Sequence, residues 1–235
     1  MSHASRVAPL YDPAYEHDSC GVGLVVDIAG RPSRSIVQRA LAGLVNLTHR
    51  GGVGADARTG DGAGLLTQVP FALFRPDLAR LGRSDLSPGD LGVAMVFLPA
   101  GNGERAGGWL EAAMAERGLP ILGWRDVPTD PMVLGPVARS TLPAIAQLLV
   151  VRPEGMDGDR FERELFLARR AAERRAVAEG AGEGDFFVVS CSARTIIYKG
   201  FCLPEDLAAF YGDLRDPAFE SAIALFHQRY STNTM

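Results

Sequence analysis

The sequence predicts an α+β fold, with strands in two sets and helices on the outside of the strands. Short apolar runs such as residues 20–28, 91–98 and 145–151 have the length and the valine content of buried strands. Other stretches repeat apolar residues every three or four positions, which is typical of helices packed on one side. A chain of 235 residues with 47% apolar and 22% charged residues can bury a core. We therefore expect one α+β body without internal repeats.

The first elements follow one another closely. The strand at residues 20–28 begins at a cysteine. A helix then starts at Ser33 or Ser35 and carries one apolar stripe until Gly51 ends it. The glycine-rich stretch after the helix predicts tight backbone turns and leads into a strand at residues 65–69.

The middle of the chain has a βαβ rhythm. A strand at residues 91–98 precedes a helix at 104–117 and another extended piece at 119–127. Residues 128–143 are rich in proline and are interpreted as a connection. A buried strand at residues 145–151 follows it.

The last third begins with a helix that Asp159 is expected to cap, because Glu162 stands three residues later. Its exposed face carries arginine and glutamate, so it should be solvated. The remaining predicted elements are a hairpin of strands at 186–190 and 195–201, a short helix at 203–211 and a central strand at 221–229.

Charge and hydropathy exclude two kinds of partner. The formal net charge is -4 and no block of like charges occurs, so neither nucleic acid nor an anionic membrane surface should bind. No apolar run approaches the roughly 20 residues of a membrane span. Residues 1–19 contain no apolar region of the kind found in secretory signals, so we expect the chain in the cytoplasm.

The cysteines and histidines favour neither disulfides nor metal. Cys20, Cys191 and Cys202 are widely spaced, and we expect the last two to be packing residues. The four histidines have no ligand spacing, so no metal is predicted. His227 lies in a predicted strand and is interpreted as a core histidine, whereas His49 ends a helix.

Cys20, unlike the other two cysteines, is a candidate catalytic residue because a polar leader precedes it. A cysteine at the start of a strand is by itself most often a small buried hydrophobe. Removal of residues 1–19 would leave Cys20 with a free α-amino group, whose pKa of roughly 7.7–8.0 suits it to accept the thiol proton. The cysteine could then act as an N-terminal nucleophile without a histidine.

Four motifs resemble one known family. They are CGVG at residues 20–23, LTHRGGVGADARTGDGAGLL at 47–66, SARTIIYKG at 192–200 and FHQRYSTNT at 226–234. Together they resemble the amidotransferase domain of glutamate synthase large subunits. HRGG and RYST also resemble the wider class II glutamine amidotransferases, whereas TGDGAGLL and the stretch from RTIIYKG to HQRYSTNT are particular to glutamate synthases.

The resemblance implies an αββα sandwich of the N-terminal nucleophile hydrolase type over residues 20–235, preceded by a leader at 1–19. It also implies that the domain is truncated at its C-terminus. In the family an Asn-Gly pair downstream of RYST forms the oxyanion hole, and a later acidic residue binds the substrate amine. Neither is present here, so we expect this chain alone to be a poor glutaminase, because each lost donor costs about a hundredfold to a thousandfold in rate.

The resemblance also implies roles for individual residues. Cys20 attacks the side-chain amide of L-glutamine to form a thioester and release ammonia, and its own amine is the base. Arg229 binds the substrate α-carboxylate, for which a planar guanidinium is suited. Thr232 and Asn233 add a hydroxyl and a backbone N–H to the same carboxylate.

Other residues of the motifs have weaker implied roles. Arg50 and Gly51 are possible residues of the site lining, together with the glycine loop at 60–64. Asp61 in TGDG is interpreted as a turn residue. Asn102-Gly103 precedes RYST and is interpreted as a turn rather than as the oxyanion pair.

For the full enzyme the resemblance implies FMN, an iron-sulfur cluster and electrons from NADPH or ferredoxin, none of them bound by this part of the chain. Ammonia would pass to 2-oxoglutarate in the synthase domains, and a small reductase subunit is a further implied partner. Three alternatives stay open: another class II amidotransferase, a non-catalytic binding module that keeps the fold, and a gene fragment.

Overall fold

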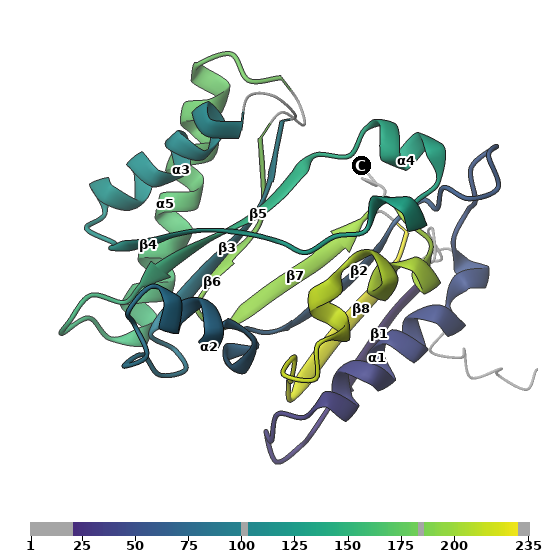
Figure 1. The fold of residues 1–235 in the computed structure, drawn as a ribbon, viewed down its shortest axis with the longest axis horizontal. Helices are drawn as coiled ribbons and strands as arrows, with labels where there is room; N and C mark the ends of the chain where they lie inside the picture. Colours follow the sequence, from purple (N-terminus) through teal and green to yellow (C-terminus); the bar gives the residue numbers. More distant parts are fainter. Residues whose placement is uncertain (1–20, 100–102, 183–185, 230–235) are drawn as a thin grey trace, which may run out of the picture.

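The computed structural model describes residues 21–99, 103–182 and 186–229. Within these ranges the chain forms two four-stranded sheets, and every strand pair in them is antiparallel (Figure 1). The first sheet has the order β1 (Gly21–Val26), β8 (Ile223–Gln228), β2 (Ala63–Gln68) and β7 (Thr195–Gly200). The second has the order β4 (Ile121–Asp126), β5 (Ala144–Val151), β3 (Leu91–Leu98) and β6 (Phe187–Ser192). The α+β class is confirmed.

The described helices lie at the sides of these sheets (Figure 1). The longer ones are α1 (Arg34–Asn46), α2 (Phe71–Arg80), α3 (Gly103–Glu116) and α5 (Gly158–Ala178). The short ones are α4 (Pro136–Ser140), α6 (Leu207–Phe210) and the 3-10 turns η2 (Thr48–Arg50), η3 (Pro131–Val133), η4 (Pro204–Asp206) and η5 (Gly212–Arg215). Among the residues described, no helix is long and apolar enough to cross a membrane.

One face of the first sheet is covered by α1, and the contact depends on two glycines. The Phe226 ring of β8 lies between Gly23 of β1 and Gly43 of α1. A β-carbon on Gly23 would lie 2.2 Å from the ring, and one on Gly43 would lie 2.6 Å from it. A larger residue at either position would therefore displace the Phe226 ring and disturb the packing of α1 on the sheet.

The opposite face of the first sheet is apolar and open. Because side chains alternate along a strand, Val22, Leu24 and Val26 all lie on this face, and Leu225 is paired with Leu24. Their exposed fractions are 58%, 56%, 48% and 39%. We call this surface, defined by Val22, Leu24, Val26 and Leu225, the open face.

The second sheet has its own helical layer. Side chains of β3, β5 and β6 pack against α3 and α5 in a separate core that includes Val96, Leu148, Phe161 and Leu165. β3 and β4 both run antiparallel to β5, so they are parallel to each other, with α3 as their connection. The predicted βαβ rhythm is therefore present, with β5 inserted between its two strands.

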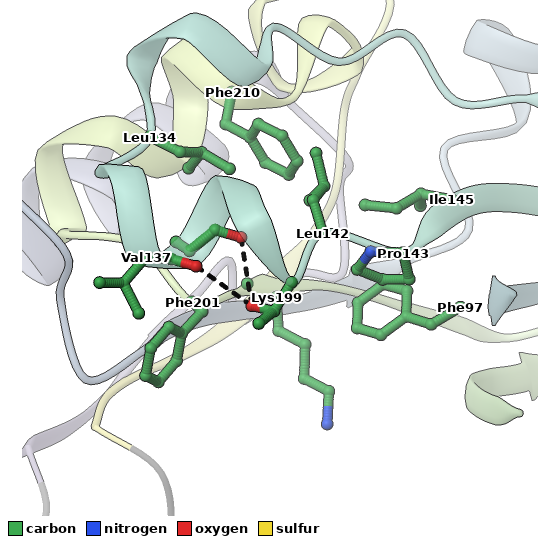
Figure 2. A pocket seen from close by; sticks show the side chains of 12 residues that line it. Phe97, Leu134, Val137, Leu142, Pro143, Ile145, Lys199, Phe201 and Phe210 are labelled. Atoms are coloured by element: carbon green, nitrogen blue, oxygen red, sulfur yellow. Dashed lines mark hydrogen bonds between the residues drawn. The ribbon is translucent and has the colours of Figure 1, made fainter. Parts of the chain in front are cut away.

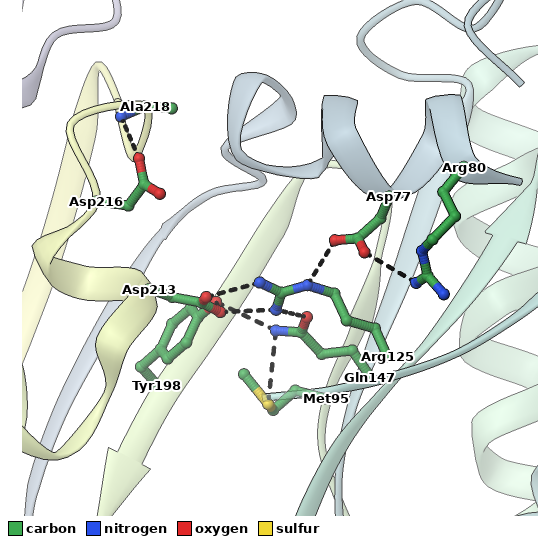
Figure 3. Close-up of polar contacts among 9 residues, drawn as sticks. All are labelled: Asp77, Arg80, Met95, Arg125, Gln147, Tyr198, Asp213, Asp216 and Ala218. Atoms are coloured by element: carbon green, nitrogen blue, oxygen red, sulfur yellow. Dashed lines mark hydrogen bonds and ion pairs between the residues drawn. The ribbon is translucent and has the colours of Figure 1, made fainter. Parts of the chain in front are cut away.

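A buried polar network joins the two sheets (Figure 3). Arg125 of β4 donates from Nη2 to Asp213 Oδ1 at 2.7 Å and from Nη1 to Asp213 Oδ2 at 2.9 Å. Its Nη1 also donates to Gln147 at 2.8 Å, and its Nε donates to Asp77 of α2 at 2.8 Å. Tyr198 of β7 donates its hydroxyl to Asp213 at 2.8 Å. Burial alone would lower the pKa of Arg125, but the Asp213 carboxylate outweighs it and the pKa is raised.

Several predicted elements need correction. The N-cap of α5 is Asp157, whose carboxylate accepts from the Arg160 N–H at 2.8 Å, and not Asp159. Glu162 does not close a capping box, because its carboxylate accepts instead from the Ser192 hydroxyl at 2.8 Å and from the Ala193 N–H. Asp159 pairs with Arg194.

Three segments differ from the prediction in the amount of helix that they contain. The sequence did not predict α2, because Pro76 lies inside it. The proline-rich connection at 128–143 contains η3 and α4. The helix expected at 203–211 is a 3-10 turn followed by only four α-helical residues.

Candidate active site

The candidate site lies where β1 begins and β8 ends. Gly21, the first residue of β1, is paired with Gln228, the last residue of β8. Gln228 is also paired with Ala63, the first residue of β2. This end of the first sheet therefore collects the residue that follows Cys20 and the residue that precedes Arg229. Cys20, Thr232 and Asn233 themselves lie outside the described residues.

Arg229 leaves the strand with an unusual backbone. Its φ is +79°, in the left-handed region that few residues other than glycine adopt. Its N–H donates to the carbonyl of Gly62 at 2.7 Å, which ties the residue to the start of β2. The Nε of its side chain lies 3.8 Å from Oδ2 of Asp61. The structure thus fixes the backbone of Arg229 next to the Asp61 carboxylate.

Arg50 and Gly51, at the turn after α1, are brought to the same place. A β-carbon on Gly21 would lie 3.2 Å from the β-carbon of the exposed Arg50, so Arg50 adjoins the residue after Cys20. A β-carbon on Gly51 would lie 1.9 Å from Gln228 Nε2 and 2.9 Å from Asp61 Oδ1. A larger residue at position 51 would therefore displace the ends of the Gln228 and Asp61 side chains.

The glycine-rich loop folds back on itself like a hairpin. Residues Val53 and Gly60 form an isolated antiparallel bridge. At the tip, one Asp56 carboxylate oxygen accepts from the N–H groups of Arg58 and Thr59 at 3.0 and 2.7 Å. Hydrogen bonds from the Thr59 hydroxyl and from these N–H groups lower the pKa of Asp56. The loop therefore has a defined path that returns the chain to Asp61.

Asp61 and Gln228 are involved in the site in ways that the sequence analysis missed. Asp61 accepts from the Gly52 N–H at 2.9 Å as well as facing Arg229, so it is more than a turn residue. Gln228 is 1% exposed, yet within the described part of the chain its Oε1 has no hydrogen-bond donor, and the same holds for Asp61 Oδ1. Asp61 belongs to the motif TGDG and Gln228 to HQRYST, and this membership is the feature of the sequence that could have indicated a role in the site.

His227 is a half-buried residue beside the site. A β-carbon on Gly64 would lie 2.4 Å from its Cε1 atom, so the imidazole ring covers Gly64. Burial lowers the pKa of His227, and the positive charge of Lys199 lowers it further. Both effects favour the neutral form of the ring.

The two described cysteines are packing residues. Cys191 contacts α5 through its Sγ, which lies 3.6 Å from the Leu165 carbonyl, and Cys202 belongs to the core around the first sheet. Burial raises the pKa of each thiol to about 12. Because they lie in separate cores, they do not fit an iron-sulfur ligand set. In the described ranges, no group of three or more His, Cys, Asp or Glu side chains is arranged to hold a metal ion.

An apolar cavity of about 500 Å³ lies beside the end of β7 (Figure 2). Arg229, Asp61 and Gln228 are not among the residues that line it. Its wall includes Phe97, Leu134, Ile145, Phe201 and Phe210. The Thr141 hydroxyl hydrogen-bonds to backbone carbonyls of α4. Among the described residues of its lining, Lys199 alone is charged, and its ammonium lies 4.3 Å from the centre of the Phe187 ring. This wall lacks the convergent charged groups that a zwitterionic amino acid needs.

Comparison with known proteins identifies the family. The model of the class II glutamine amidotransferases matches residues 20–235. The chain belongs to this family. As a class II amidotransferase it is 42% identical to the large chain of NADPH glutamate synthase from Bacillus subtilis, over 96% of this chain and 15% of the relative.

Two further glutamate synthases give the same result. The large chain of the NADPH enzyme of Azospirillum brasilense is 41% identical over 98% of this chain and 15% of its own length. The chloroplastic ferredoxin-dependent enzyme of Oryza sativa is 39% identical over 98% of this chain and 14% of its own length. This amidotransferase chain thus spans about 15% of such relatives. The resemblance to the amidotransferase domain of glutamate synthases is confirmed.

Proposed function

We propose that this chain performs the glutamine-hydrolysing step of a glutamate synthase, with Cys20 as an N-terminal nucleophile after removal of residues 1–19. The observation that carries the proposal is the pairing of Gly21 with Gln228, because it makes the residue after Cys20 a neighbour of the residue before Arg229. The family match, which begins at residue 20, supports the same boundary.

The proposed reaction uses groups of this chain. Arg229 binds the α-carboxylate of L-glutamine, assisted by Thr232 and Asn233. The α-amine of Cys20 takes the thiol proton, and the sulfur attacks the side-chain carbonyl carbon. The C–N bond breaks as that proton passes to the leaving nitrogen, which yields ammonia and a glutamyl thioester. Water then cleaves the thioester to glutamate and the free thiol. Arg50 and Gly51 line the site.

The proposal includes the αββα sandwich of the N-terminal nucleophile hydrolases. The open face supports it, since four neighbouring apolar side chains on one sheet face are between 39% and 58% exposed. A layer packed on that face would remove this apolar surface from water. We expect the layer on that face to be a further β-sheet of the same polypeptide, distinct from the two sheets described above.

The reaction of the whole enzyme is also a proposal. Ammonia would pass to 2-oxoglutarate in synthase domains, which would hold FMN and an iron-sulfur cluster and receive electrons from NADPH or ferredoxin. The relatives support both donors, since their names specify NADPH in two cases and ferredoxin in another. A small reductase subunit and a cytoplasmic location stay predictions.

The proposal is tested by intact-mass spectrometry of the protein expressed from its native locus, with and without diazo-oxo-norleucine, an electrophilic analogue of glutamine. We expect a species that begins at Cys20 and carries one adduct on that residue. Cys20→Ser should lose the adduct and reduce ammonia release by at least about a thousandfold. A species that retains residues 1–19 and takes no label would refute the proposal and favour a non-catalytic binding module.

A further inference from the structure

The arginine at the end of β8 has an acidic neighbour that is itself fixed in place. Arg229 Nε lies 3.8 Å from Asp61 Oδ2, and the two side chains are 38% and 31% exposed. Asp61 Oδ2 also accepts from the Gly52 N–H at 2.9 Å, while the Asp61 N–H donates to the Gly52 carbonyl at 3.2 Å. The carboxylate therefore has little freedom to move away from the arginine.

The backbone of the arginine is fixed as well. Its left-handed conformation and the 2.7 Å hydrogen bond to Gly62 join it to the residue that follows Asp61. Such a conformation is unfavourable for a residue with a side chain and persists where the surroundings enforce it. The Arg229 side chain thus begins at a constrained point next to Asp61.

Two acceptor atoms of the pair and its neighbour Gln228 have no donor among the residues that the structure describes. Asp61 Oδ1 and Gln228 Oε1 are buried without a hydrogen bond from those residues, and Gln228 is 1% exposed. Unpaired buried acceptors destabilise a fold, so an arrangement that retains two of them is not optimised for stability. Proteins retain such destabilising arrangements mainly at functional sites, for example where a ligand binds.

We propose that Asp61 is a positioning residue for Arg229, holding the guanidinium by its Nε side so that both terminal nitrogens face the α-carboxylate of glutamine. This inference rests on the proposed function and deepens it. A guanidinium carries five N–H groups in a planar fork, and two parallel bonds to a carboxylate use one edge of that fork. With the Asp61 carboxylate fixed on the Nε side, the edge formed by the two terminal nitrogens is left for the substrate carboxylate.

The inference gives the glycine-rich loop a purpose. Gly51 leaves room for Gln228 and Asp61, and Gly52 binds the Asp61 carboxylate through its N–H. The segment from HRGG to TGDG therefore holds the Asp61 carboxylate next to Arg229 of the HQRYST motif. Asp56 belongs to the same loop, but the described residues that donate to its carboxylate are Arg58, Thr59 and Val137, and Arg229 is not among them.

The test measures the dissociation constant of L-glutamine by calorimetry, in the full-length protein with Cys20→Ser to prevent hydrolysis. We expect Asp61→Asn, which keeps an oxygen for the Gly52 N–H but loses the charge, to raise the dissociation constant about tenfold. In an Arg229→Ala background the same change should have an effect of less than about twofold, because the two residues act as a unit.

Asp56→Asn is the matched control, since it removes a charge from the same loop without touching Arg229. It should leave the dissociation constant within about twofold of the reference. The inference is overturned if Asp61→Asn has no effect, if Asp56→Asn has an equal effect, or if the Asp61 and Arg229 effects multiply.

The two proposals fail separately. If Asp61→Asn weakens glutamine binding as expected but the protein with Cys20 intact releases no ammonia, the proposed hydrolysis fails and the positioning role stands. If ammonia is released and neither the dissociation constant nor the KM responds to Asp61→Asn, only the positioning role fails. A protein that binds no glutamine overturns both.

Discussion

Two of the arginine–aspartate pairs in this molecule, Arg125–Asp213 and Arg229–Asp61, differ in burial, in distance and in hydrogen bonding. Arg125 and Asp213 are 11% and 2% exposed and are joined by two bonds of 2.7 and 2.9 Å. Arg229 and Asp61 are 38% and 31% exposed and approach only to 3.8 Å, and Asp61 Oδ1 and Gln228 Oε1 have no hydrogen bond from any described residue. The first pair has both carboxylate oxygens bonded, and it belongs to the network that joins the two sheets through Tyr198. The second is unsaturated, which is what a site that takes up a ligand requires.

The largest effect is expected from breaking the saturated pair. Arg125→Met leaves the buried Asp213 carboxylate without its cation, and we expect a loss of about 3–5 kcal/mol in the free energy of unfolding. Chemical denaturation measures it. Arg229→Met is the control and should change the same quantity by less than about 1 kcal/mol, since the pair is partly exposed. Equal losses in both variants would remove the distinction between the pairs.

The next effect separates function from stability at Arg229. Arg229→Gly removes the guanidinium, so kcat/KM for glutamine should fall about a hundredfold or more. Glycine accepts a φ of +79° without strain, so the free energy of unfolding should rise by up to about 1 kcal/mol relative to Arg229→Ala. Glutaminase assays and thermal unfolding of both variants check this. A less stable glycine variant contradicts the backbone argument.

A smaller effect is expected inside the saturated network. Tyr198→Phe removes the hydroxyl that donates to Asp213 and accepts from Gln147 Nε2 at 3.1 Å. Because Arg125 still pairs with Asp213, the loss should be about 1 kcal/mol. Equilibrium unfolding measures it, and glutamine KM should not change. A loss as large as that of Arg125→Met would mean that the tyrosine, not the ion pair, dominates the network.

The smallest effect concerns pH. The pKa of His227 is lowered from 6.5 by burial, so the unfolded chain binds a proton there more readily than the folded chain. The contribution of His227 to the free energy of unfolding is therefore fully present above about pH 6.5, and it is lost as the pH drops from there through the folded-state pKa. His227→Gln should flatten this part of the profile. Melting temperatures between pH 5 and 8 test it, and an unchanged slope would show that other groups cause it.

Local pattern was sufficient for most elements and for the motifs. Apolar runs located β1, β3, β5 and β8, and the apolar stripe located α1. These features depend on residues close together in the sequence, so they can be read without the fold. The helix α2 was missed because an internal proline obscures its periodicity, and the cap of α5 was misplaced by two residues because two aspartates compete for it.

The sequence by itself determined the α+β class, the family and the motif residues Cys20, Arg50, Gly51 and Arg229. Only the tertiary structure decided that Gly21 pairs with Gln228 and that Asp61 faces Arg229. It also gathered Asp77, Arg125, Gln147, Tyr198 and Asp213 into one network. The reason is physical: periodicity reports which side of an element is buried, whereas the choice of partner depends on how the whole chain packs.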